Sequence, residues 1–116
     1  MASGIIHTQT HSELLWTNPS PSANFSAQTV SLDLSGYVGV IITPKLLPSS
    51  TNMRNSVTLI KGKTTTTCFE LVGTAPVGFC GRDITVSSPG VAFGNGAYNG
   101  SANNGYWIPM YIYGIR

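Results

Sequence analysis

Apolar and polar residues alternate over short stretches of this chain, and the alternation predicts strands rather than helices. No window of eleven or more residues places its apolar residues at the spacing of a helical face. The alternation is strictest in Gln28–Leu34 (QTVSLDL), where Val30, Leu32 and Leu34 fall on one side of an extended chain and polar residues fall on the other. Such a strand has one buried face and one face in water.

Further segments have the same strand-like composition, and clusters of Gly, Pro, Ser and Asn separate them. The polar stretch Leu47–Asn55 between two of them is predicted to be a loop. Six to eight short strands at this spacing are typical of an all-β sandwich or barrel. We expect a single-domain, jelly-roll-like β-sandwich of antiparallel strands, because 116 residues make one domain. The other predicted strands are Leu14–Thr17, Tyr37–Thr43, Ser56–Lys61, Thr66–Val72, Arg82–Ser87, Val91–Phe93 and Trp107–Ile115.

The last of these strands, WIPMYIYGI, is apolar at both alternating sets of positions. A strand of this kind either lies in the centre of a sheet with both faces covered or packs against another chain. Pro109 lacks the N–H that a sheet requires, which favours an edge position or a bulge. A bare apolar edge is prone to aggregation, so we expect a neighbouring subunit to cover part of this strand. The predicted oligomer interface consists of Trp107, Met110, Tyr111 and Tyr113.

Composition and charge argue against several classes of partner. Charged residues make up 9% of the chain, against about 25% in an ordinary soluble domain. The net charge is +2 and the basic residues form no run, so we expect no nucleic-acid partner. No apolar stretch reaches about 18 residues, so we expect no membrane span. The N-terminus lacks the basic start and apolar run of a secretory signal.

Catalytic and metal-binding patterns are weak. The acidic residues are scattered, no Gly-x-Ser-x-Gly motif is present, and the Gly-x-Gly at Gly94–Gly96 is followed by no helix pattern. His7, His11 and Glu13 share one face of an extended strand and carry ligand-type side chains, but their spacing matches no metal-ligand pattern. A polar segment near a terminus explains them more simply. We expect no enzyme, no cofactor and no metal site.

The two cysteines, Cys68 and Cys80, fit no zinc or redox spacing. Both lie in apolar stretches, so free buried thiols are the favoured interpretation. The alternative is a disulfide between neighbouring strands, which requires Cα atoms about 4.4–6.8 Å apart.

The segment Phe93–Trp107 (FGNGAYNGSANNGYW) is rich in Gly, Asn and aromatic residues. Gly and Asn adopt positive φ readily, so the Asn-Gly pairs that begin at Asn95, Asn99 and Asn104 each predict a turn. One interpretation is a structural loop of tight turns. The other is a loop that faces carbohydrate, where aromatic rings stack on sugars and Asn amides bond to hydroxyls. The predicted ligand-binding residues are Tyr98, Asn99, Asn103, Asn104 and Tyr106.

Two long stretches resemble a known family. LLWTNPSPSANFSAQTVSLDLSGY and ITVSSPGVAFGNGAYNGSANNGYWIPMYIYGIR resemble the opening and the close of a small domain at the C-terminus of phage and prophage structural proteins from gut Gram-positive bacteria. Trp107 stands where the family often has a cysteine, just before an Ile-Pro step. The resemblance implies that its pattern residues are structural: Trp16, Asn18, Pro19, Phe25, Leu32, Leu34, Phe93, Gly94, Gly96, Pro109, Tyr113 and Gly114.

The resemblance implies a β-rich virion protein, in a tail-fibre tip, elsewhere in the tail or on the head. Residues 1–12 are expected to be a lead-in segment and 13–116 the virion domain, either as a stand-alone protein or as an excised domain. Fibre tips are typically trimers, so the implied partners are copies of this chain and other virion proteins. We expect attachment to a host-surface glycan. A head-decoration or fibre-cap protein with a purely structural role is the alternative, and a depolymerase of cell-wall glycans is a third, weaker hypothesis.

Overall fold

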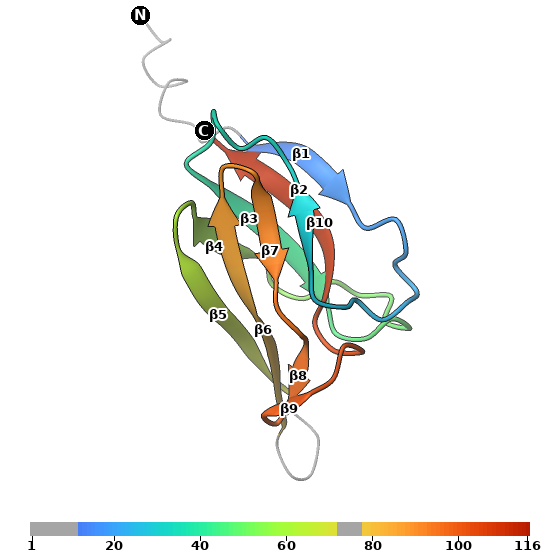
Figure 1. Ribbon diagram of the computed structural model, residues 1–116. Coiled ribbons are helices and arrows are strands. Elements are labelled where there is room, and N and C mark those ends of the chain that lie inside the picture. Colours follow the sequence, from blue (N-terminus) through green and yellow to red (C-terminus); the bar gives the residue numbers. More distant parts are fainter. Residues whose placement is uncertain (1–11, 72–77) are drawn as a thin grey trace, which may run out of the picture.

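The computed structural model describes residues 12–71 and 78–116, which form strands and connecting loops with no helix in those ranges (Figure 1). The strands pair antiparallel throughout. Their bounds are β1 Ser12–Thr17, β2 Gln28–Ser31, β3 Gly39–Lys45, β4 Val57–Ile60, β5 Thr64–Leu71, β6 Gly78–Ser87, β7 Gly90–Phe93, β8 Ala97–Tyr98, β9 Ser101–Ala102 and β10 Ile108–Ile115.

The strands build two sheets that lie one in front of the other in Figure 1. One sheet has four strands in the order β1-β10-β3-β4. The other has six, in the order β2-β7-β6-β8-β9, with β5 on the free side of β6. The predicted all-β sandwich is confirmed. Each predicted strand overlaps an observed one, and the two extra strands, β8 and β9, are too short for their alternation to be visible in sequence.

The core consists of apolar side chains that both sheets contribute to one cluster. In β6 the buried positions alternate with more exposed ones, so that Ile84 and Val86 are fully buried. From the opposite sheet, Val40 and Ile42 of β3 and Ile112 of β10 are buried just as completely. The period of two that predicted the strands therefore also identifies the core face.

Strand β10 lies in the centre of its sheet, between β1 and β3, and not at an edge. The bulge that Pro109 favours is present, because the β10–β3 register shifts between Pro109 and Tyr111. Pro109 lies opposite Pro44, so neither residue has an N–H to offer the other. The inward-facing residues of β10 are therefore core, whereas Tyr111 and Tyr113 on its other face are only half-buried.

The predicted oligomer interface is corrected at two positions. Trp107 is fully buried and Met110 is 7% exposed, so both side chains pack inside this chain and offer no surface to a partner. Trp107 has a φ of 57°, a left-handed conformation that is rare outside Gly, Asn and Asp. Tyr111 and Tyr113 are half-buried and stay available on the outside of the sheet.

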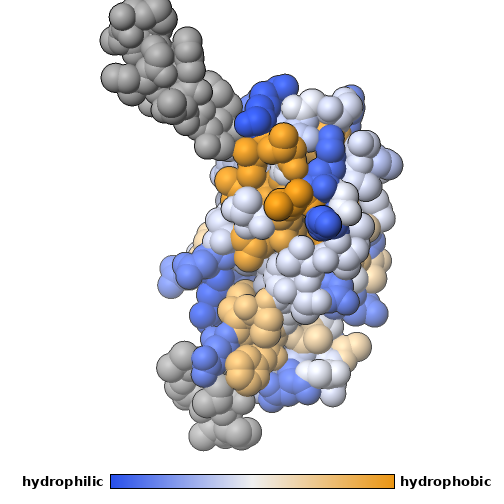
Figure 2. Space-filling model, turned by 90° about the vertical axis from the view of Figure 1, so that its left-hand side faces the viewer, coloured by the Kyte–Doolittle hydropathy of each residue, from blue (hydrophilic) through white to orange (hydrophobic). Residues whose placement is uncertain are grey.

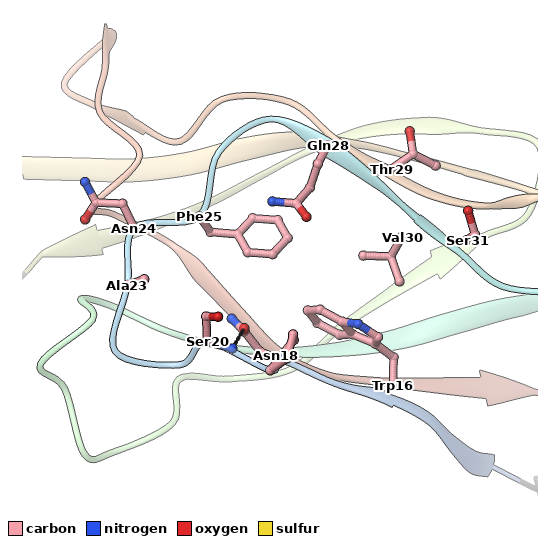
Figure 3. Close-up of a pocket in the computed structure, with 11 residues that line it drawn as sticks. Trp16, Asn18, Ser20, Ala23, Asn24, Phe25, Gln28, Thr29, Val30 and Ser31 are labelled. Carbon is pink, nitrogen blue, oxygen red and sulfur yellow. Dashed lines mark hydrogen bonds between the residues drawn. The ribbon is translucent and has the colours of Figure 1, made fainter.

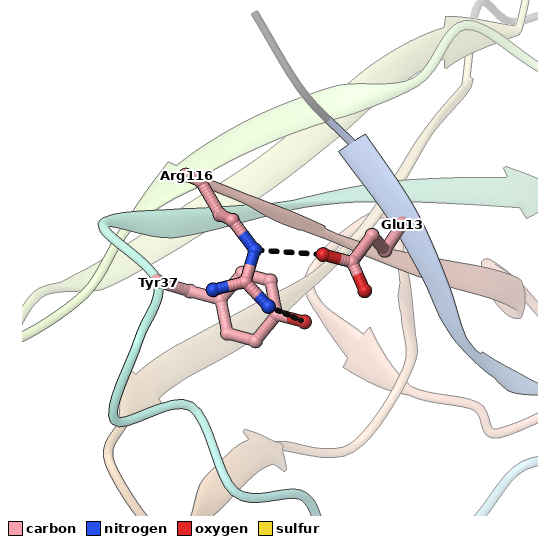
Figure 4. Close-up of polar contacts among 3 residues, drawn as sticks. All are labelled: Glu13, Tyr37 and Arg116. Atoms are coloured by element: carbon pink, nitrogen blue, oxygen red, sulfur yellow. Dashed lines mark hydrogen bonds and ion pairs between the residues drawn. The ribbon is translucent and has the colours of Figure 1, made fainter.

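Arg116 links the start and the end of the described chain, which lie side by side. Its Nε donates to Glu13 Oε1 at 2.7 Å and its Nη2 donates to the Tyr37 hydroxyl at 3.1 Å (Figure 4). The guanidinium also lies 4.4 Å from the centre of the Tyr37 ring. These contacts with Glu13 raise the pKa of Arg116 above its usual value. Glu13 thus has a structural ion pair, while His7 and His11 lie outside the described residues.

Candidate functional site

The Gly/Asn segment, residues 93–107, folds back on itself through the short β8–β9 hairpin. Asn99 and Gly100, at its corner, both have positive φ (50° and 83°), which confirms the turn predicted there. Asn104-Gly105 also forms a turn, although neither residue has positive φ, so the turn predicted there is confirmed as well. Asn95-Gly96 does not form a turn, so the prediction is wrong at that pair. Gly96 is needed for another reason: a Cβ there would come within 2.6 Å of two backbone oxygens, those of Asn103 and Tyr106.

Arg82, a residue of β6, organises this segment from inside the protein. Only 2% of it is exposed. Its Nε donates to the Trp107 carbonyl at 2.7 Å, and its Nη1 donates to the Gly94 carbonyl at 2.8 Å. Its Nη2 donates to the carbonyls of Tyr106 at 3.3 Å and Asn104 at 3.5 Å. One guanidinium therefore satisfies carbonyl groups along the length of the segment.

The charge of Arg82 has no acidic partner in the contacts of the described chain; the carbonyl dipoles and an aromatic face take that place. Its guanidinium carbon lies 5.2 Å from the centre of the Phe25 ring. Burial lowers the pKa of Arg82 to about 10, so the group stays protonated at neutral pH. The strand pattern RDITVS did not predict a role for Arg82. Arg82 shares the inward face of the strand with Ile84 and Val86, a face that apolar residues usually occupy.

The three asparagines predicted to bind ligand use their side-chain oxygens inside the segment. Asn99 Oδ1 accepts from the Phe79 N–H at 2.8 Å. Asn103 Oδ1 accepts from the Gly105 N–H at 3.0 Å. Asn104 Oδ1 accepts from the Gly96 N–H at 2.8 Å, and its Nδ2 donates to Asn95. These amides hold the loop in shape.

The two predicted tyrosines pack against each other. The rings of Tyr98 and Tyr106 stack with centroids 4.7 Å apart and planes 24° apart. Both are half-buried and contact the core cluster. The structure thus brings the five predicted ligand residues together, but in a loop whose aromatic faces and amide oxygens are engaged with one another.

A more open site lies where the outer edges of the two sheets approach each other, between β1 and β2. A cleft of about 490 Å³ occurs here, within the range of about 300–1,000 Å³ that small-ligand sites occupy. We call it the β1–β2 cleft. It is lined by Trp16, Asn18, Pro19, Ser20, Ala23, Asn24, Phe25, Gln28, Thr29, Val30 and Ser31.

Figure 3 shows how these side chains lie. Trp16, Phe25, Gln28 and Val30 point toward one another across the cleft, whereas Thr29 points away from it. This follows from the alternation in β2, since residues 28 and 30 share one face. Trp16 and Phe25 meet edge to face, with centroids 6.1 Å apart and planes 75° apart. The cleft therefore combines an aromatic wall with polar groups.

Gln28 is a polar side chain that Figure 3 shows beside Phe25, and it is exposed to solvent. Its Nε2 donates to the Ser26 carbonyl at 3.0 Å, which fixes the amide and leaves its oxygen directed elsewhere. Among the described residues, that oxygen accepts no hydrogen bond. Asn18 differs, because its amide donates to Pro109 and accepts from Ser20 and is thereby engaged. Gln28 was not among the predicted site residues. In QTVSLDL it shares a face with Val30, Leu32 and Leu34, and a polar residue on that apolar face was a signal that could have identified it.

The described residues contain no group of three His, Cys, Asp or Glu side chains placed to hold a metal ion. No helix within the described ranges is long and apolar enough to cross a membrane.

Both cysteines are free. Cys80 faces the core, where burial raises the pKa of its thiol to about 12, as predicted for a buried thiol. The prediction of a buried thiol is wrong for Cys68, which is exposed because its side chain lies on the outward face of β5.

The outer face of the four-stranded sheet is a second candidate surface. Leu14, Tyr113 and Ile41 are paired across β1, β10 and β3, and Leu14 is 55% exposed. Val38 and Ile60 at the β4 side are 63% and 64% exposed. Figure 2 looks onto the side where β4 and β5 lie and shows a block of strongly apolar surface in its upper half. Such surface is typical of a contact with another protein.

Compared with known proteins, the chain matches no family model, no curated protein and no solved structure. The site geometry therefore has to support any functional conclusion.

Proposed function

We propose that this chain is a virion domain of a bacteriophage that attaches to glycan on the host surface, in a trimeric tail-fibre tip or another tail-associated protein. The observation that carries the proposal is the β1–β2 cleft, where the half-buried Trp16 ring lies near the exposed Gln28 amide, whose oxygen accepts no hydrogen bond among the described residues. Phe25 is 5% exposed and backs the Trp16 ring from inside the protein. Aromatic faces pack on the C–H groups of sugars, and amides bond to sugar hydroxyls.

The location of the cleft suits attachment. It lies at one side of the sandwich, where its residues come from the end of β1, from all of β2 and from the loop that joins them. Binding residues placed on loops and edges of a rigid scaffold are common in recognition domains. One shallow cleft binds a sugar weakly, and several copies in a fibre tip would raise the avidity.

Retention on cells tests the proposal. The purified chain, tethered on beads at high density, is incubated with gut Gram-positive cells and with their purified wall polysaccharide. We expect retention that soluble polysaccharide displaces and that Gln28→Leu weakens. Asn103→Ala, in the Gly/Asn segment, is the matched control and should bind normally. If the wild-type chain is retained on neither, attachment is excluded and the structural role below takes its place.

A purely structural role, as a head-decoration or fibre-cap protein, is the second candidate, and one observation favours it. The outer face of the four-stranded sheet carries Leu14, Tyr113 and Ile41 in one row and Tyr111 beside it. If this face is an assembly surface, light scattering at micromolar concentration gives a multiple of the 12.3 kDa chain mass. Tyr113→Lys then returns the monomer, whereas Thr85→Lys on the opposite sheet leaves the assembly intact.

A further inference from the structure

We infer that the β1–β2 cleft selects uncharged sugars and rejects acidic ones. This inference rests on the proposed attachment function, since it specifies which class of glycan the cleft takes. It follows from three properties of the cleft: the absence of charged lining residues, the engagement of Arg82, and the kind of polar group presented.

Among the described residues, none of the side chains that line the cleft is Asp, Glu, Lys, Arg or His. An acidic sugar carries a carboxylate, sulfate or phosphate, which must lose part of its hydration when it enters. A charge that is taken out of water without a partner is strongly disfavoured. The cleft offers such a group no counter-charge, so acidic sugars are excluded by the cost of desolvation and not by shape.

Arg82 is a cation that lies over the ring of the cleft residue Phe25, and it is not available to an anion. It is 2% exposed and does not line the cleft. Its guanidinium donates to the carbonyls of Trp107, Gly94 and Tyr106, and its carbon lies over the Phe25 ring. Reaching a ligand would require breaking these bonds, which hold the Gly/Asn segment in place.

The polar group that faces the aromatic wall is an acceptor. Gln28 Nε2 is held by the Ser26 carbonyl at 3.0 Å, so the amide presents its oxygen. A sugar hydroxyl, or the N–H of an N-acetyl group, can donate to that oxygen, whereas an ionised carboxylate group at the same place has no hydrogen to donate. Ser20 lies at the end of the cleft next to Asn18 and adds a hydroxyl group that can both donate and accept.

Titration of the isotope-labelled full chain tests the inference by nuclear magnetic resonance. Neutral oligosaccharides of hexose and N-acetylhexosamine are compared with uronic-acid and phosphate-bearing oligomers of equal length, at low and high salt. We expect the neutral sugars to shift the Gln28 side-chain amide and Trp16 indole signals, with an affinity that salt leaves unchanged. Gln28→Leu should weaken binding about tenfold. The folded state of each variant is checked from the same spectra.

The outcomes separate this inference from the proposed function. If acidic oligomers bind as well as neutral ones, or bind better at low salt, neutral selectivity is refuted while attachment stands. If neither class binds, the attachment function itself fails. If neutral sugars bind but shift Tyr98 and Asn103 in place of Gln28 and Trp16, the site lies in the Gly/Asn segment and the inference is overturned.

Discussion

The Gly/Asn segment and the β1–β2 cleft are built from the same kinds of residue, yet they differ in what those residues have left to offer. In the segment, Tyr98 and Tyr106 stack on each other, and Asn99 and Asn104 bond to backbone N–H groups. In the cleft, the Gln28 oxygen faces an aromatic wall and accepts no hydrogen bond among the described residues. Composition alone favours the segment as a binding site.

A candidate site is therefore marked by unused hydrogen-bonding capacity and not by residue type. Each amide or ring has a limited set of partners, and a buried polar group that finds one inside the protein stabilises the fold. The segment uses its partners to hold its own shape around Arg82. Substitutions should therefore cost stability in the segment and binding in the cleft.

Removal of the Arg82 guanidinium is the severest test of the segment's structural role. Arg82→Met leaves the carbonyls of Trp107, Gly94 and Tyr106 without their donor, so we expect the free energy of unfolding to fall by about 3 kcal/mol or more. Urea unfolding followed by tryptophan fluorescence measures this. Arg54→Met, an exposed arginine over Phe69, is the control and should cost less than about 1 kcal/mol. Equal losses of unfolding free energy in the two variants would show that Arg82 does not organise the segment.

Close packing at Gly96 gives the next largest effect. Gly96→Ala brings a methyl group to within 2.6 Å of backbone oxygens, which must move apart, so we expect a loss of about 1–3 kcal/mol. Gly36→Ala is the matched control, because its new methyl group meets only the flexible end of Arg116, at 3.1 Å. It should change the unfolding free energy by about 0.5 kcal/mol or less. A Gly96→Ala protein as stable as the control would show that the segment is loosely packed.

The sheet scaffold could be predicted from sequence because a period of two is a local signal. QTVSLDL already identifies Val30 and Leu34 as core residues, and both are buried. The order of the strands within each sheet could not be predicted in this way. Whether β10 is central or at an edge depends on β1 and β3, which are far from it in sequence, and this is why its apolar faces suggested a subunit interface. Trp107 was misplaced because nothing local indicates a positive φ for tryptophan.

The candidate site was harder to predict than the scaffold. Aromatic and amide residues predicted a ligand loop, but the bonds that engage Asn104 run to Gly96 and Asn95, and they exist only once the segment is folded. The β1–β2 cleft requires two strands of different sheets to approach, and no local pattern reports that distance. Gln28 at an apolar position was the available clue.

Two asparagines provide a finer comparison of segment and cleft. Asn104→Ala removes the acceptor of the Gly96 N–H and should cost about 1 kcal/mol of unfolding free energy. Asn24 lines the cleft, and within the described chain its side chain makes no hydrogen bond, so Asn24→Ala should cost about 0.5 kcal/mol or less. Both values come from urea unfolding at pH 7. The comparison fails if Asn24→Ala proves the more damaging substitution.

Gln28 should show the smallest effect on stability, and the sign of that effect carries information. A glutamine among Trp16, Phe25 and Val30 leaves an acceptor unused, and Gln28→Met replaces it with an apolar side chain of similar length. We expect stability to stay unchanged or to rise by about 0.5 kcal/mol, as is common when a functional residue is replaced by one that suits the fold better. Thermal unfolding measures the change. A loss above about 1 kcal/mol would mean that Gln28 supports the fold, and the cleft would then differ from the Gly/Asn segment only in shape.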